Sequence, residues 1–144
     1  MSTAAQAAPE RTPLPTLDAF THVRAEILRL SDLDFQKHVN NAATTSLFAN
    51  ARFDYLGDVV RPHLTPDAKL VIARLEVDFT GEIVYGAPVH TGTRILGFGR
   101  TSMRLEQALF QNGRCAARAV SVFVHKAAGA AAPWPQAVLP LAVA

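Results

Sequence analysis

The segment from Ser31 to Leu56 decides the fold, and its sequence is SDLDFQKHVNNAATTSLFANARFDYL. Its second part predicts a helix over residues 41–56. There Leu47, Phe48 and Tyr55 recur at the spacing of one helical face, and polar side chains occupy the opposite face. We therefore expect one long helix that buries an apolar stripe.

The ends of this helix carry boundary signals. Asn40 or Asn41 is the expected N-cap residue, and Gly57 is the expected C-terminal stop. The preceding residues, 31–38, are polar and irregular and predict a loop. Residues 58–69 contain two prolines and predict a connection.

The rest of the ordered chain alternates between apolar and polar residues, which predicts strands. The first is expected over Phe20 to Leu30, with Val23, Ala25 and Ile27 on its apolar face and a bend near Leu28. Four more are expected near residues 70–79, 87–98, 101–110 and 114–125. In the second strand the residues predicted to point inward are Val71, Ala73, Leu75, Val77 and Phe79. The Asn112-Gly113 pair predicts a tight hairpin before the last strand.

This order of one strand, one long helix and four strands predicts an α+β fold. A doubly wound parallel sheet is excluded because it needs a helix for each crossover. The economical arrangement is a five-stranded antiparallel sheet that wraps around the helix. Such a sheet leaves an edge open, and pairing with a second copy is the common remedy. We therefore expect a homodimer or a dimer of dimers, which is a homotetramer.

Length and composition fit one soluble domain of 144 residues with 49% apolar residues and a net charge of +2. We expect the domain over residues 18–126, between a disordered N-terminal arm (1–17) and an Ala/Pro-rich tail (127–144). The cations are scattered, so no nucleic-acid partner is expected. The tail has the length of a membrane span, but three prolines interrupt it, and no membrane association is expected. Trp134 either covers a neighbouring subunit's pocket or anchors the tail, and we prefer anchoring.

Cys115 is the single cysteine, which excludes an internal disulfide and fits a reducing compartment. The first nine residues lack the pattern of a secretory signal. We therefore expect a cytoplasmic protein. Cys115 begins a hydrophobic strand, so we interpret it as a packing residue rather than as a nucleophile.

The loop before the helix is the first candidate for chemistry, because Asp32, Asp34 and His38 lie just before a helix N-terminus. Asp34 then faces the free backbone N–H groups of the helix and the positive end of its dipole. These groups can stabilise a substrate carbonyl whose oxygen becomes negative during a reaction. A capping role for either aspartate is the structural alternative. We expect no metal, because hard cations bind more oxygen ligands than this loop offers. We also expect no cofactor.

A longer motif spans the loop and the first turns of the predicted helix. The pattern D-x-x-x-H-V-N-N-A from Asp34 to Ala42, followed by Phe48 and by A-R at positions 51–52, resembles the signature of the 4-hydroxybenzoyl-CoA thioesterase family of the hot-dog superfamily. The similarity is to its bacterial acyl-CoA thioesterase branch and covers residues 20–125. It implies a hot-dog fold, two subunits joined edge to edge, and an active site at their interface.

The resemblance also implies site residues. It places the family's catalytic aspartate on Asp34 and its carbonyl-polarising backbone amide on Asn41, and His38 completes the catalytic motif. The basic and hydroxyl residues that meet CoA phosphates in such enzymes correspond to Arg100, Thr101 and Ser102. Arg100 is equally well interpreted as a solvated turn residue.

The sequence departs from the family pattern near the expected pocket. Lys37 stands where many relatives have glycine, Thr44 stands where they have tyrosine, and uncharged residues replace glutamates later in the helix. Asp34 is then the acid/base candidate of the site. Thr44 and Thr45 are interpreted as substrate-binding residues that position a water or the acyl carbonyl. A bond from threonine back to a helix carbonyl is the structural alternative.

We therefore predict an acyl-CoA thioesterase that hydrolyses a fatty or aromatic acyl-CoA to the free acid and CoA. A thiol has a pKa of about 8.5, so the thiolate leaves readily, and one carboxylate with one oxyanion donor suffices. Asp34 acts as general base or as nucleophile. The alternative is a protein that binds an acyl-CoA or acyl-carrier-protein thioester without hydrolysing it. A hot-dog dehydratase would need a His and acidic-residue pattern that the sequence lacks.

Overall fold

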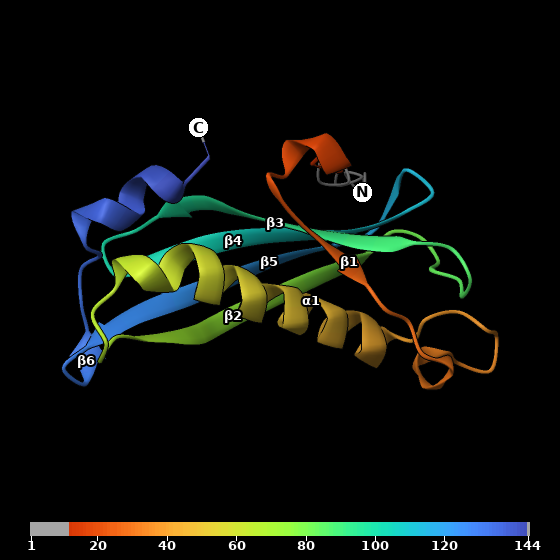
Figure 1. Ribbon diagram of the computed structural model, residues 1–144, viewed down its shortest axis with the longest axis horizontal. Coiled ribbons are helices and arrows are strands. Elements are labelled where there is room, and N and C mark those ends of the chain that lie inside the picture. Colours follow the sequence, from red (N-terminus) through yellow and green to blue (C-terminus); the bar gives the residue numbers. More distant parts are fainter. Residues whose placement is uncertain (1–11, 144) are drawn as a thin grey trace, which may run out of the picture.

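A computed structural model of the chain describes residues 12–143, in which one antiparallel sheet curls around a single long helix (Figure 1). The helix is α1 (Asn41–Tyr55). The strands are β1 (His22–Glu26), β2 (Lys69–Phe79), β3 (Val89–Phe98), β4 (Ser102–Gln111), β5 (Arg114–Ala127) and β6 (Ala130–Ala131). Their order in the sheet is β1-β3-β4-β5-β2, with β6 paired to β5. The predicted α+β class and the wrapped sheet are confirmed, and β6 is an addition.

The start of α1 agrees with its sequence signal. Asn40 is the N-cap, and its Oδ1 accepts a hydrogen bond from Ala43 N at 2.7 Å. The α-helix ends at Tyr55 with Leu56 as its C-cap, so the predicted stop of the α-helix at Gly57 is confirmed. The chain continues in a π-helical turn over Leu56–Val60 and a short 3-10 turn over Arg61–His63. The extension places Val60 in the core, where its side chain is fully buried, and this burial outweighs the local preference of glycine.

A buried amide fixes α1 over the sheet. Gln107 on β4 donates from Nε2 to Phe48 O at 3.0 Å and to Thr93 Oγ1 at 3.1 Å. Its Oε1 accepts from Arg52 Nη1 at 3.2 Å. These bonds connect the middle of the helix with two central strands, and two larger apolar clusters lie on either side of them.

The first strand is shorter than expected, and its polar face is the buried one. Its apolar residues point away from α1, and Ile27 just beyond the strand is 87% exposed. Arg24 instead contacts Asp54 of α1 at 2.9 Å, and Glu26 accepts a bond from Thr91 Oγ1 at 2.7 Å. Polar partners on α1 and β3 therefore override the apolar pattern of β1.

Strand β2 forms an edge of the sheet, and the prediction that its apolar residues are buried is mostly wrong. Leu75 is 36% and Phe79 is 51% exposed, whereas Val77 packs against the core. A register shift between Ile72 and Arg74 also breaks the predicted alternation. An open edge with exposed apolar side chains is suited to pairing with another strand.

The hairpin between β4 and β5 agrees with the prediction. Asn112 and Gly113 have φ values of 52° and 74°, which a two-residue hairpin turn of this hand requires. The turn between β3 and β4 also lies where the glycines predicted it, between Phe98 and Ser102.

The C-terminal residues complete one end of the core. Trp134 stacks on His125 with ring centroids 4.8 Å apart, and its Nε1 donates to Ser102 O at 2.9 Å. Val138 is fully buried, and Val143 N donates to Ile95 O at 3.0 Å, which satisfies the edge of β3 beyond β1. This end of the chain therefore packs into the domain, and Trp134 is an anchor.

The expected N-terminal arm lies largely outside the described residues. Of the part that is described, residues 12–16 are irregular and Leu17–Ala19 forms a 3-10 turn. Phe20 then packs on β3 at Gly92. Within residues 12–143, no helix has the length and apolar character needed to cross a membrane.

Candidate active site

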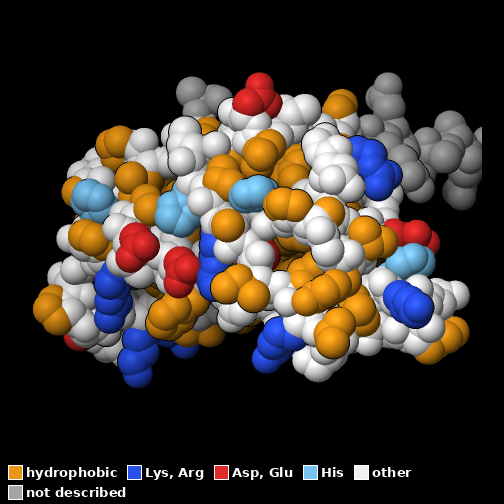
Figure 2. Space-filling model, turned by 45° about the vertical axis from the view of Figure 1, so that its right-hand side comes forward, with side chains coloured by type: hydrophobic (Ala, Val, Ile, Leu, Met, Phe, Trp, Pro, Cys, Tyr) orange, Lys and Arg blue, Asp and Glu red, His pale blue; other side chains and the backbone are white. Residues whose placement is uncertain are grey.

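Three segments meet at the N-terminus of α1 and enclose a cavity of about 200 Å³. They are the loop that follows β1, the first turn of α1, and the segment after β2; Phe79 of β2 and Ala116 and Ala117 of β5 also line the cavity. Four residues predicted from the sequence line the cavity: Asp34, His38, Asn41 and Thr44. Acidic and histidine side chains lie next to each other on the surface at this end of the molecule (Figure 2).

The Asp34 loop is a tight turn that holds its own carboxylate. Asp34 Oδ1 accepts hydrogen bonds from Gln36 N at 2.8 Å and His38 N at 3.1 Å. Asp34 N in turn donates to His38 O at 2.8 Å. Lys37 adopts a φ of 63°, in the left-handed region that favours glycine. A glycine would adopt this backbone conformation without strain, and this chain adopts it with lysine.

The two aspartates of the loop have different roles. Asp32 is buried, and its carboxylate accepts hydrogen bonds from Arg29 N at 2.8 Å and Arg29 Nη2 at 3.3 Å. Its carbonyl accepts from Asn40 N at 2.9 Å. Asp32 is thus the capping residue of this segment, and Asp34 is the carboxylate that faces the cavity.

The first turn of α1 presents backbone donors to the cavity. Asn40 uses its side chain for the Ala43 amide and its carbonyl for the Thr44 amide. The amides of Asn41 and Ala42 have no acceptor within the helix, as in any first turn, and they lie at the positive end of its dipole. Asn41 lines the same cavity as Asp34, and its backbone N–H has no acceptor within the helix.

The two threonines of the first turns differ. Thr44 is 3% exposed and lines the cavity. Thr45 lies outside the cavity lining, and its Oγ1 donates to Asn41 O at 2.9 Å, which is the structural alternative for this residue.

Sequence reasoning missed Glu82. Its Oε2 lies 3.3 Å from His38 Nε2, and both residues line the cavity. The contact arises because the Asp34 loop runs beside the segment after β2, where Val39 N donates to Ile83 O at 2.8 Å. No local pattern marks Glu82, since its neighbour is 44 positions away in the sequence.

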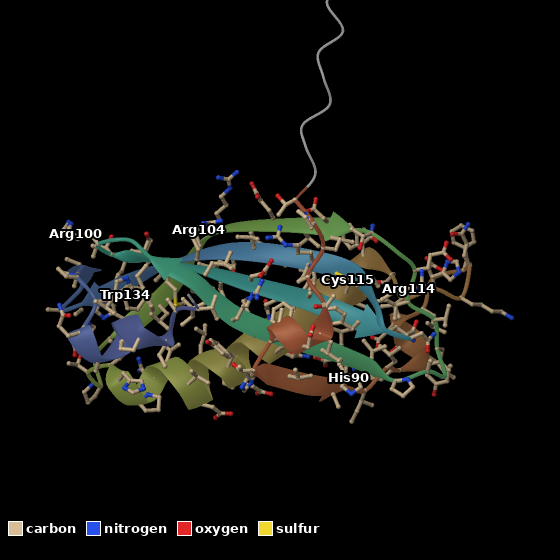
Figure 3. The ribbon with its side chains drawn as sticks, turned by 90° about the horizontal axis from the view of Figure 1, so that it is seen from above. His90, Arg100, Arg104, Arg114, Cys115 and Trp134 are labelled. Atoms are coloured by element: carbon tan, nitrogen blue, oxygen red, sulfur yellow. The ribbon has the colours of Figure 1, made fainter. Side chains whose placement is uncertain are left out.

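The expected CoA-binding residues lie elsewhere in the chain. Arg100, Thr101 and Ser102 form the turn between β3 and β4, at the end of the molecule opposite the cavity (Figure 3). Thr101 O accepts from His125 N at 2.8 Å. One chain by itself therefore does not bring this turn to Asp34.

The described residues support neither a metal site nor a cysteine nucleophile. No group of three His, Cys, Asp or Glu side chains in residues 12–143 is placed to hold a metal ion. Burial raises the pKa of the Cys115 thiol, which disfavours the thiolate that a nucleophile needs.

Most of the chain is similar to a known protein family. Residues 28–140 match the family model of the thioesterase-like superfamily. The chain belongs to this superfamily. The predicted hot-dog family and the enzyme class, a thioester hydrolase, are thereby confirmed.

Solved structures agree with this assignment. A Thermus thermophilus thioesterase, in complex with coenzyme A and zinc, is 34% identical over 85% of this chain and 92% of its own, with a TM-score of 0.73. A predicted thioesterase from Bacillus stearothermophilus is 27% identical over 81% and 89%, with a TM-score of 0.70. A 1,4-dihydroxy-2-naphthoyl-CoA thioesterase from Synechocystis, 18% identical over 79% and 89% with a TM-score of 0.65, shares the fold. The comparison with curated proteins finds no match.

Proposed function

We propose that this protein hydrolyses acyl-CoA thioesters in the cavity between Asp34 and the N-terminus of α1. The observation that carries the proposal is the position of two complementary groups on one small cavity. These are the Asp34 carboxylate, oriented by two backbone amides, and the first-turn amide of Asn41. A base or nucleophile and an oxyanion donor are what thioester hydrolysis requires.

The chemistry follows from these two groups. With Asp34 as general base, a water attacks the thioester carbonyl carbon while Asp34 takes its proton. The negative charge that develops on the carbonyl oxygen is stabilised by the Asn41 N–H, a contribution of about 3 kcal/mol for one well-placed donor. The C–S bond then breaks, and CoA leaves as a thiolate that receives the proton. In the alternative, Asp34 attacks directly and water hydrolyses the resulting anhydride.

His38 contributes in this account mainly through its backbone. Its N–H orients Asp34, while its imidazole contacts Glu82. The imidazole thereby links the catalytic loop to the segment after β2 and keeps the loop in place. Thr44, which is buried and lines the same cavity, is the residue we assign to the acyl carbonyl or the attacking water.

A second copy of the chain completes the site in this proposal. The cavity of one chain is smaller than the roughly 300–1,000 Å³ of most ligand pockets. The exposed apolar side chains of β2 favour edge-to-edge pairing with the β2 of a partner. Antiparallel pairing about a two-fold axis places the partner's β3–β4 turn, with Arg100, Thr101 and Ser102, at this end of the molecule. Its cation and hydroxyls then meet the CoA phosphates.

The experiment is thiol release from short-chain, long-chain and aromatic acyl-CoAs, with the free acid identified as the second product. Turnover of any of these substrates supports the proposal, and the preferred acyl group defines the fatty or aromatic class. Binding of the same thioesters is measured in parallel. Tight binding without release of thiol would favour the alternative, a protein that holds the thioester without hydrolysing it.

A further inference from the structure

A second cavity, of about 640 Å³, lies on the face of the sheet that points away from α1. Arg118 on β5 and Asp78 near the end of β2 line it from the sheet, and the two residues are direct partners there. Residues 12–14 line it from the segment before β1, whose Phe20 packs on the same outer face (Figure 1). The volume falls within the roughly 300–1,000 Å³ of most small-molecule pockets. The proposed hydrolysis does not use this cavity.

Arg118 brings a positive charge that its neighbours neutralise only in part. Glu106, which precedes the inward-pointing Gln107 and therefore points outward, is 3% exposed and is shared by two arginines. Its Oε1 accepts a hydrogen bond from Arg118 Nε at 2.7 Å, and its Oε2 accepts one from Arg94 Nε at 2.7 Å. One carboxylate thus serves two guanidinium groups, so one positive charge is left over.

The remaining donors belong to Arg118 rather than to Arg94. Arg94 Nη1 donates to Ala19 O at 3.1 Å, and its guanidinium carbon lies 4.9 Å from the centre of the Phe20 ring. Arg118 has no second partner of this kind within residues 12–143, where its hydrogen bond to Glu106 uses Nε alone. Its side chain is 18% exposed, so its two Nη atoms are the donors that it can offer to a ligand in the cavity.

Asp78 brings the opposite charge to the same cavity. Directly opposed side chains of an antiparallel pair have Cβ atoms about 4.5–5.5 Å apart, so Asp78 and Arg118 could reach each other. Among the ion pairs of residues 12–143 they form none, because Arg118 is bonded to Glu106 on β4 and Asp78 lies on β2, on the other side of β5. The next outward carboxylate of β2, that of Glu76, is paired with Arg74. The cavity therefore has a positive end and a negative end.

A ligand for this cavity must carry both charges. An anion alone would be repelled by Asp78, and a cation alone would be repelled by Arg118. A neutral molecule would displace water from both charged groups without neutralising either. An α-amino acid carries a carboxylate for the Arg118 guanidinium and an ammonium for the Asp78 carboxylate on one carbon atom, and such charge-assisted hydrogen bonds are the strong ones.

The other lining residues indicate what the rest of the ligand is. Leu14 is 46% and Phe79 is 51% exposed, and an apolar side chain on the ligand would cover both. Thr80 Oγ1 donates its proton to Cys115 O at 2.9 Å, so toward the cavity it is an acceptor. An acceptor next to Asp78 adds a second partner for an ammonium group.

We propose that this cavity binds a free α-amino acid with an apolar side chain, its carboxylate at Arg118 and its ammonium at Asp78. The site lies apart from the thioester cavity, with which it shares only Phe79 among its lining residues. The proposal does not depend on the proposed hydrolysis, because binding alone tests it.

The test is isothermal titration calorimetry of the full chain with L-phenylalanine and L-leucine. Two analogues of phenylalanine carry one charge each: 3-phenylpropionate lacks the ammonium, and 2-phenylethylamine lacks the carboxylate. We expect one L-phenylalanine to bind per chain, and each analogue to bind at least about tenfold more weakly, because each loses a hydrogen-bonded charge pair.

Asp78→Asn is the decisive variant, since Asp78 is exposed and has no ion-pair partner among residues 12–143. We expect it to weaken L-phenylalanine binding at least about tenfold and to bind 3-phenylpropionate at least as tightly as the wild type does, because the repulsion of the carboxylate is gone. A merely structural role of Asp78 would weaken both ligands. Glu76→Gln, on the same face of β2 but outside the cavity lining, is the matched control and leaves both affinities unchanged.

Arg118→Gln should give the reverse pattern, with weaker binding of L-phenylalanine and undiminished binding of 2-phenylethylamine. Because this variant leaves Glu106 with Arg94 alone, its folding is checked by urea denaturation. The conclusion stands on Asp78→Asn if Arg118→Gln does not fold.

Absence of L-phenylalanine and L-leucine binding by the wild type at millimolar concentration would overturn the proposal. Equal affinity for L-phenylalanine and 3-phenylpropionate would also overturn it, because the site would then recognise only an anion. Binding that is lost in Asp34→Asn but kept in Asp78→Asn would place the ligand in the thioester cavity and contradict the assignment.

Discussion

The backbone N–H of His38 donates a hydrogen bond to Asp34 Oδ1 at 3.1 Å, so the main chain of His38 orients the carboxylate that faces the cavity. The imidazole of His38 contacts Glu82 instead. We expect His38→Ala to lower kcat by no more than about tenfold, because the backbone donor remains and a general acid/base group is worth about 10²–10⁴-fold. Steady-state thiol release measures this. A loss of a hundredfold or more would show that the imidazole itself transfers a proton.

Lys37 provides a test of the loop's backbone strain. Its φ of 63° costs a non-glycine residue about 1–2 kcal/mol. Glycine avoids this cost, but its greater flexibility in the unfolded state lowers the stability by about 0.5–1 kcal/mol. Lys37→Gly is therefore expected to raise the free energy of unfolding by about 0.5–1 kcal/mol, measured by urea denaturation. Lys69→Gly, in strand β2, is the matched control and lowers stability. A loss of stability in Lys37→Gly would show that the lysine side chain makes a contact worth more than the strain.

Gly92 tests the packing of the N-terminal segment on β3. A Cβ at this position would lie 2.4 Å from Phe20 Cγ, so the ring must move. Gly92→Ala is expected to lower the free energy of unfolding by about 1–3 kcal/mol. Gly97→Ala is the control, because nothing lies within 4 Å of its added Cβ. Equal stability of the two variants would mean that Phe20 moves aside at no cost.

Glu26 gives a pH dependence with a defined sign. Burial raises its pKa above the ordinary value, and the hydrogen bond from Thr91 opposes this only in part. The folded state therefore binds more protons than the unfolded state, and the contribution of Glu26 to stability is lost as the pH rises through the raised pKa. Glu26→Gln should gain stability relative to the wild type in urea denaturation as the pH rises above the ordinary glutamate pKa of about 4.3. A difference that does not change with pH would show that Glu26 titrates normally.

Local features of the fold could be predicted from the sequence because their causes are local. Asn40 caps α1 through the amide three residues ahead, and Asn112-Gly113 sets its own turn. α1 ends next to Gly57 as predicted, but the helical turns that follow it were not predicted, since burial of Val60 depends on the whole core. The buried face of β1 was also inverted, because Glu26 finds its partner on β3, which is far away in the sequence.

In the candidate site, too, the residues that are close in sequence could be predicted and the distant ones could not. Asp34, Asn41 and Thr44 belong to one short segment, so their meeting follows from the loop and the helix N-terminus. Glu82 comes from the segment after β2, and only the tertiary fold brings it to His38. The β3–β4 turn lies at the end of the molecule opposite the cavity, so this chain's own fold does not bring it to Asp34.

Thiol release by Asp34→Asn shows whether the Asp34 carboxylate performs the chemistry. Asparagine keeps the size of the side chain and can accept the same backbone hydrogen bonds, but it is a poor base and nucleophile. Asp58→Asn, at an exposed position in the helical turn after α1, is the control. We expect Asp34→Asn to lose kcat by about a hundredfold or more while it still binds the thioester, and Asp58→Asn to behave as the wild type. Turnover by Asp34→Asn within a few-fold of the wild type would contradict it.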